Sequence, residues 1–122
     1  MSWRLQTQVL VDDATASTTA PTGTTIGAQA LAIPENIRDL ALKFLLSGVT
    51  TPDVDVDVHV LDHDGSWRLE SSFSLEDLED ESGDLYLPIA SDAWLYKAVQ
   101  PVFTLNSGAA TMRCVATYRQ ES

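Results

Sequence analysis

The stretch from Asp53 to Leu75 places the strongest constraint on how this chain folds. Within it, valines alternate with polar residues, and a period of two puts the valines on one face of a strand and the polar side chains on the other. The valines are Val54, Val56, Val58 and Val60, and the polar residues are Asp53, Asp55, Asp57 and His59. The turn residues Asp62–Gly65 follow, and glycine is suited to the positive φ of many tight turns. The pattern predicts a β-hairpin whose valines lie in a core.

The return strand of this hairpin begins at Trp67 and also alternates. It is predicted to carry Trp67, Leu69 and Phe73 on one face. The opposite face is predicted to carry Arg68, Glu70 and Ser72. The valine face and the tryptophan face of the hairpin are therefore expected to hold the core together.

The rest of the chain is also typical of short strands. The runs that favour a strand are Trp3–Val11, Ile26–Ile33, Ile37–Leu46, Asp84–Ala90, Trp94–Leu105 and Thr111–Tyr118. Of these, Ile37–Leu46 also fits a helix by propensity, but its alternation and short length favour a strand. The segment Ser74–Gly83 breaks the alternation, which predicts at most one short helical turn near Leu75–Glu81.

About eight short strands separated by turn residues are the signature of an all-β fold, an antiparallel β-sandwich or jelly roll. The turns are predicted at Ser47-Gly48, at Asp62–Gly65 and at Asn106–Gly108. A chain of 122 residues is expected to form a single domain, 1–122. Residues 1–25 are expected to form an N-terminal strand and an arm. The small hydroxyl residues of Ala14–Thr25 indicate a loop that is held by the sheet or by a neighbouring chain.

The charge balance excludes several classes of partner. There are 18 Asp and Glu against 7 Lys and Arg, which gives a net charge of −11. Nucleic-acid phosphates and anionic membranes would be repelled, so we expect no nucleic acid and no membrane as partner. No run approaches the ~18 apolar residues of a membrane span, and the first residues lack the apolar run of a signal peptide, so synthesis in a cytoplasm is expected.

The aspartates of the hairpin, Asp53, Asp55 and Asp57, are the most conspicuous candidate for a metal site. Residues two apart on a strand lie about 6.6–6.8 Å apart, which is too far for three carboxylates to share one calcium ion without a bend. The EF-hand spacing also fails, because Val58 stands where that loop needs glycine. A solvated strand face is therefore favoured, or a surface that meets a basic partner. We expect no metal site here.

The sequence also gives little support for catalysis. The two histidines, His59 and His63, would need a third metal ligand from elsewhere. No G-x-S-x-G motif and no glycine-rich phosphate loop is present, which makes a hydrolase a weak interpretation. The single cysteine, Cys114, excludes an internal disulfide and is expected to be a small buried hydrophobe. No catalytic residue and no cofactor is predicted.

The aromatic residues leave one binding function open. Exposed rings can stack on a sugar, as in a carbohydrate-binding module, although packing on a sheet is the usual role of an aromatic residue in an alternating strand. Such a module would need at least two coplanar exposed rings from a small set. The candidates are Trp3, Tyr86, Trp94 and Tyr96.

Three motifs resemble a family of small β-sandwich proteins encoded among the structural genes of tailed bacteriophages and prophages. The motifs are Ile33-Pro34-Glu35-Asn36 with Arg38-Asp39-Leu40, the turn Asp64-Gly65-Ser66-Trp67, and the closing threonine-containing strand Thr111–Tyr118. The resemblance implies a non-enzymatic virion structural protein, a capsid decoration or cement protein. A neck or tail component is the alternative.

The same resemblance implies the partners and the location. The expected partners are the major capsid protein or other virion proteins, together with further copies of the chain in a homo-oligomer, and the expected location is the virion. The acidic hairpin face and the N-terminal strand and arm are the surfaces expected to contact these partners. The candidate partner-binding residues are Asp53, Asp55, Asp57, Trp3, Thr18 and Thr19.

Overall fold

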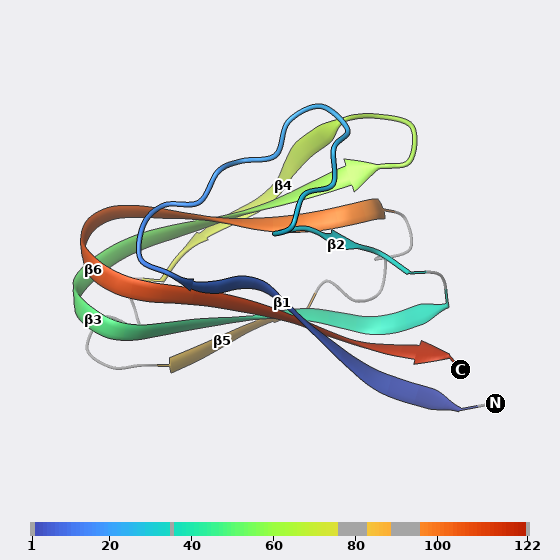
Figure 1. Cartoon of the computed structure of the whole chain (residues 1–122), viewed down its shortest axis with the longest axis horizontal. Coiled ribbons are helices and arrows are strands. Elements are labelled where there is room, and N and C mark those ends of the chain that lie inside the picture. The colour runs from blue at the N-terminus through green and yellow to red at the C-terminus, as the bar shows by residue number, and fades with distance from the viewer. Residues whose placement is uncertain (1, 35, 76–82, 89–95, 122) are drawn as a thin grey trace.

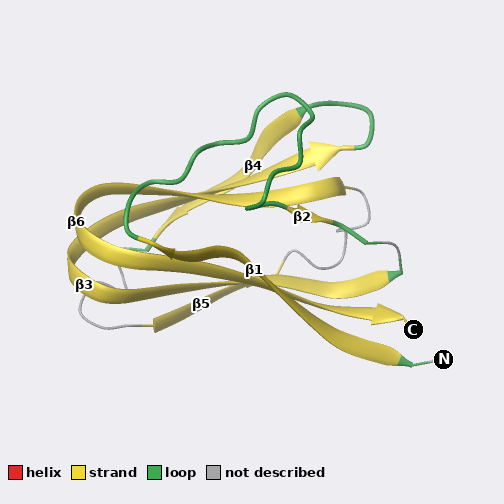
Figure 2. Cartoon of the chain, viewed as in Figure 1, coloured by secondary structure: helices red, strands yellow, loops and turns green. Residues whose placement is uncertain are grey.

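The chain folds as an all-β structure of antiparallel strands, as the sequence predicts. The computed structural model describes residues 2–34, 36–75, 83–88 and 96–121. Its strands are β1 (Trp3–Ala14), β2 (Leu31–Ala32), β3 (Ile37–Asp62), β4 (Trp67–Ser74), β5 (Gly83–Pro88) and β6 (Tyr96–Glu121) (Figures 1 and 2). No helix in this part of the chain is long and apolar enough to cross a membrane. The helical turn predicted near Leu75–Glu81 lies outside the described residues, apart from its first residue.

Two long strands, β3 and β6, form the frame of the fold. Each has 26 residues, and they pair antiparallel from Ile37 opposite Gln120 to Asp62 opposite Tyr96. Both curve round at one end of the molecule (Figure 1). The bend coincides with register shifts between Ser47 and Val54, and each strand has a glycine with positive φ there, Gly48 at 59° and Gly108 at 74°.

The bend corrects two turns predicted from the sequence. Ser47-Gly48 and Asn106–Gly108 do not separate strands; they lie inside β3 and β6. The predicted strands on either side of each glycine are halves of one bent strand. Paired strands can bend in this way because glycine, which has no Cβ, adopts the left-handed conformation at little steric cost and so changes the direction of the backbone.

The bent strands fold one hydrogen-bonded sheet into two layers, which makes a β-sandwich. In the first layer, the first half of β3 pairs with the second half of β6. β5 lies beside β3 at one edge of this layer, and β1 lies beside β6 at the other. In the second layer, the second half of β3 pairs with the first half of β6. β4 lies beside β3 at one edge, and β2 lies beside β6 at the other. The ring of Phe44 in the first layer meets Phe73 and Phe103 of the second edge to face, with centroids 5.2 and 5.9 Å apart.

The core lies between these layers and follows the predicted alternation. The valines of the hairpin, from Val54 to Val60, are fully buried. On β6, Met112, Cys114 and Ala116 are also fully buried, while the residues between them are half-buried. Burial of these apolar side chains is the main force that holds the layers together.

The predicted hairpin is present, but its return strand does not keep one face. β4 pairs with β3 from Ser74 opposite Asp55 to Trp67 opposite Leu61, with a register shift between Val58 and His59. Phe73, opposite Val56, faces the core. Beyond the bulge, Trp67 and Leu69 lie on the outer face, and Leu69 is 53% exposed. The prediction that all three share a face is wrong because a bulge reverses the alternation.

Three other segments also differ from what their sequence pattern suggests. Gly65 adopts no positive φ, although its N–H does close the turn onto the carbonyl of Asp62. The predicted strand Ile26–Ile33 shrinks to the two residues of β2. In β1, a register shift between Val9 and Val11 places Val11 in the core beside Leu10, whereas Val9 remains exposed. Strict alternation therefore fails in β1 as it does in β4.

The bend glycines give a direct test of this frame. Changing Gly48 to Ala puts a Cβ in a left-handed conformation, which costs about 1–2 kcal/mol; its surroundings leave room, since the nearest atom is Thr111 Oγ1 at 3.8 Å. We expect Gly48→Ala and Gly108→Ala each to lower the free energy of unfolding in urea by that amount.

The matched control is Gly27→Ala, because Gly27 lies in an exposed segment before β2, has no positive φ, and leaves no atom within 4 Å of an added Cβ. This variant should be as stable as the unchanged chain or slightly more stable. Equal losses in all three variants would show that the bend does not depend on the left-handed glycines.

Candidate functional site

The acidic face predicted from the hairpin lies on the outside of the second layer. Because the valines of β3 point inward, Asp53, Asp55 and Asp57 point outward, and all three are half-buried. Asp57 accepts a hydrogen bond from Ser72 Oγ at 2.6 Å, and Asp55 accepts one from Asn106 Nδ2 at 2.8 Å. These bonds tie the aspartates to both neighbouring strands.

A shallow hollow of about 360 Å³ lies between these carboxylates. Its lining residues are Asp55, Asp57, Ser72, Phe73 and Thr104. Among the residues that the structure describes, no three His, Cys, Asp or Glu side chains come together in positions that would hold a metal ion. The arrangement presents a rigid acidic surface, which suits a basic partner.

The two histidines occupy different environments. His59 is half-buried within β3, opposite Leu69 on one side and Gln100 on the other. His63 is exposed in the turn after β3. Neither lines the acidic hollow or the hollow under the arm described below.

An ion-pair cluster around Arg68 lies at the turn end of the hairpin. Arg68 donates to the carboxylate of Asp62 at 2.7 Å and to that of Glu70 at 2.5 Å, and its guanidinium lies 5.6 Å from the ring of Tyr96. These hydrogen bonds, first to Asp62 and then to Glu70, raise the pKa of Arg68 above its usual value. The positive charge of Arg68 is thus matched within its own hairpin.

The N-terminal arm is held by its own sheet. Thr18 donates its N–H to the carbonyl of Phe103 at 2.9 Å, and its Oγ1 accepts the Phe103 N–H at 3.0 Å. Ser17 Oγ accepts the N–H of Leu105 at 3.0 Å, and the carbonyl of Thr19 accepts Gln100 Nε2 at 3.1 Å. Of the two possibilities left open by the sequence, the structure shows the arm on the sheet.

Further along, the arm crosses to the other edge of the second layer. The carbonyls of Gly23 and Thr25 accept the backbone N–H and the indole N–H of Trp67, at 3.1 and 2.8 Å. Trp67 therefore fastens the arm, whereas the sequence suggested a place in the core. The arm then returns to β2, which pairs with Ala98 and Val99 of β6 (Figure 1).

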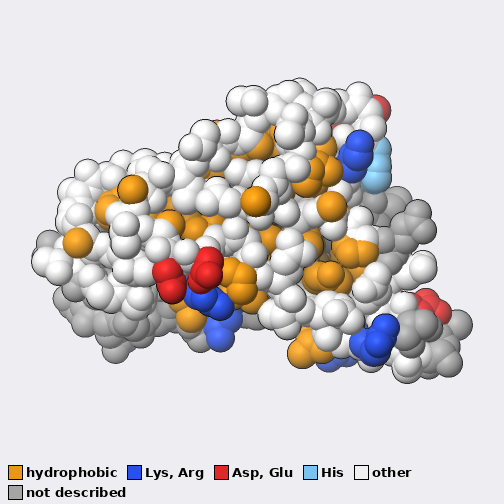
Figure 3. Space-filling view, viewed as in Figure 1, with side chains coloured by type: hydrophobic (Ala, Val, Ile, Leu, Met, Phe, Trp, Pro, Cys, Tyr) orange, Lys and Arg blue, Asp and Glu red, His pale blue; other side chains and the backbone are white. Residues whose placement is uncertain are grey.

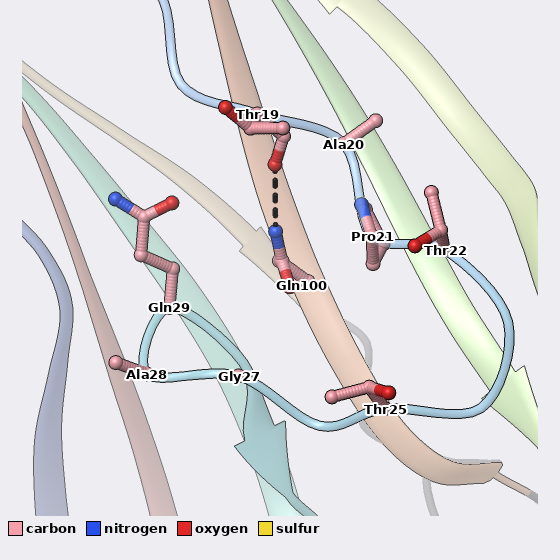
Figure 4. A pocket seen from close by; sticks show the side chains of 9 residues that line it. All are labelled: Thr19, Ala20, Pro21, Thr22, Thr25, Gly27, Ala28, Gln29 and Gln100. Carbon is pink, nitrogen blue, oxygen red and sulfur yellow. Dashed lines mark hydrogen bonds between the residues drawn. The ribbon is translucent and has the colours of Figure 1, made fainter.

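The arm and the sheet enclose a hollow of about 470 Å³ (Figure 4). Its lining is neutral: Thr19, Ala20, Pro21, Thr22, Thr25, Gly27, Ala28, Gln29 and Gln100. Gln100 is the one buried polar residue of the described core, and its side chain is used to hold Thr19. This hollow has no titratable group with which to perform acid–base or nucleophilic chemistry.

The aromatic residues in the described part of the chain form no common platform. Trp3 is 37% exposed, but the Arg38 guanidinium lies over its ring at 4.1 Å. Tyr96 is half-buried and lies in the other layer, opposite Asp62. Trp94 falls outside the described residues, and Tyr86 is described by its backbone alone. The described rings thus do not meet the requirement for stacking on a sugar.

Cys114 is buried, as expected. Its side chain is fully inside the core, and burial raises the pKa of the thiol well above its usual value. The thiol stays protonated near neutral pH and is a poor nucleophile.

Sequence reasoning missed an apolar strip on β1. Trp3, Leu5 and Val9 alternate along the strand and are 37%, 69% and 40% exposed. Figure 3 shows hydrophobic side chains along the face that carries β1, with acidic side chains in small separate groups. Period two alone predicts that these residues share a face, but it does not say which face is buried.

Comparison with known proteins extends to the fold alone. No protein-family model and no curated protein matches this sequence. A solved structure described as the infectious bursal disease virus VP2 subviral particle is similar, with a TM-score of 0.51 and 15% identity over 98% of this chain. A structure of the Gx strain of that virus has a TM-score of 0.47 and 13% identity over 97% of this chain. The chain spans about a third of the length of these proteins, 33% and 32%.

The contact between the arm and β6 can be tested by removing one hydroxyl group, that of Thr18. Thr18→Val removes the acceptor of the Phe103 N–H, and a buried unsatisfied donor costs about 1–3 kcal/mol. We expect that loss in the free energy of unfolding, together with faster hydrogen exchange of the Phe103 amide. Thr22→Val, at an exposed position of the same arm, should change neither. Similar behaviour of the two variants would refute the role given to Thr18.

Proposed function

We propose that this chain is a non-enzymatic structural protein of a virion, a capsid decoration or cement protein that stabilises the shell through protein–protein contacts. The observation that carries the proposal is the fold: 98% of the chain superimposes on part of the protein in the infectious bursal disease virus VP2 subviral particle. The resemblance of three motifs to structural proteins of tailed bacteriophages supports the finer assignment. On this proposal the chain acts in the virion and is made in the host cytoplasm.

The surfaces of the chain are consistent with such a role. The outward aspartates are held in place by Ser72 and Asn106, so a partner meets them without the cost of ordering flexible side chains. A basic surface on a major capsid protein would complement this acidic face. Trp3 adds an exposed aromatic contact at the far end of the first layer. Thr18 and Thr19 already bind their own sheet, so the outer strand and the acidic face are the better candidates for contacts with other virion proteins.

The acidic face can be tested without disturbing the fold. In the variant Asp55→Asn/Asp57→Asn the amide oxygens still accept the bonds from Asn106 and Ser72, so only the charge is lost. We expect co-sedimentation with shells of the major capsid protein to weaken by about tenfold or more and to lose most of its salt dependence. The control Asp13→Asn/Asp64→Asn removes the same charge at exposed positions off this face.

Two outcomes would count against these proposals, and they are distinguishable. If the unchanged chain stays in the supernatant with every shell and at every salt concentration, the decoration role fails. If the two double variants bind equally well, the decoration role stands but the acidic face is not the contact surface.

A further inference from the structure

The strands at the sheet edges differ in how well they are protected against pairing. β4 carries a bulge and the charged residues Arg68 and Glu70, and the N–H of Trp67 is already bonded to the arm. Bulges and charges are the usual means by which an edge strand avoids another chain. The outer edge of β6 is covered by the chain itself: by β1, by Ser17 and Thr18, and by β2.

In the described structure, the first half of the outer edge of β1, from Trp3 to Val9, has neither a bulge nor a covering segment. From Trp3 to Val9 the strand keeps a regular register with β6, and the first irregularity comes after Val9. This stretch contains no proline, no glycine and no acidic residue, and Arg4 is its single charge. In the described part of the chain, β1 pairs with β6 and with no other strand. An exposed, regular and apolar edge of this kind is a template for strand addition.

We propose that β1 pairs antiparallel with β1 of a second copy of this chain, joining the first layers of two molecules into one continuous sheet. The contact is isologous, so each pair of residues occurs twice. With Thr7 on the two-fold axis, Leu5 of one copy lies opposite Val9 of the other. The two most exposed apolar side chains of the strand are then covered by each other.

The pattern of the strand favours a second copy as the occupant, because the exposed Leu5 and Val9 are equally far from Thr7 and so lie opposite each other when the strand pairs with itself. The chain carries a net charge of −11, so two copies repel each other over most of their surface, but the Trp3–Val9 stretch is free of acids. The strand has a cationic end at Arg4 and an acidic end at Asp12 and Asp13, all exposed. Asp12 lies beyond the register shift that follows Val9 and is paired with Arg113 of its own chain at 2.7 Å, so the acids stay outside the paired stretch. The proposal does not depend on the virion role.

The test is the oligomeric state of the purified chain by sedimentation velocity, from micromolar to hundreds of micromolar protein. We expect a concentration-dependent dimer that strengthens as salt rises, because salt screens the repulsion between two copies of net charge −11. Leu5→Lys, which places a charge on the edge, should raise the dissociation constant about tenfold or more. Leu69→Lys is the matched control, since Leu69 is 53% exposed on β4, and it should leave the dimer unchanged.

A second variant tests the register in which the two β1 strands pair. Thr7→Cys places two thiols opposite each other across the axis, within disulfide reach, and should give a covalent dimer under mild oxidation. Thr22→Cys in the arm should not, and the native Cys114 is buried and out of reach. A monomer at all concentrations would overturn the proposal. So would a dimer that Leu5→Lys leaves intact, or one that Thr7→Cys fails to cross-link.

Discussion

The continuous pairing of β3 with β6 through a bend is the constraint on which the rest of the structure depends. The two strands stay hydrogen-bonded around Gly48 and Gly108, so this one pair of strands contributes to both layers. The pairing of β3 with β6 alone therefore connects the two layers. Phe44 then contacts Phe73 and Phe103 across the gap. All other described strands attach to the edges of this pair: β1 and β2 to β6, and β4 and β5 to β3.

The same pairing determines which surfaces are available for function. Once the valines of β3 are in the core, the aspartates between them must point outward, and their neighbours Ser72 and Asn106 fix their orientation. The N-terminal third of the chain is used to cover β6, which leaves β1 as an outer strand with exposed Leu5 and Val9. The features that stand out in the described structure are therefore two outer surfaces, one acidic and one apolar, to which the proposals assign contacts with other proteins.

The sequence predicted the elements that depend on local periodicity and failed where a single residue changes it. The valine hairpin follows from a two-residue period, which any strand buried on one face must have. The bulges beside His59 and Val9 insert an extra residue without a sequence signal, so the faces of Leu69 and Val11 were not predictable. Ser47-Gly48 fits a turn as well as a bend, because both use a left-handed glycine. The bonds from Thr18 to Phe103 are long-range and have no local pattern.

The most direct test of the proposed role is the copy number of this chain in purified particles, measured by quantitative mass spectrometry relative to the shell protein. A decoration protein that uses its acidic face on a repeating lattice predicts a number close to that of the shell protein. About a dozen copies or fewer would instead assign the chain to a neck or tail. Absence of the chain from the particles would contradict the account.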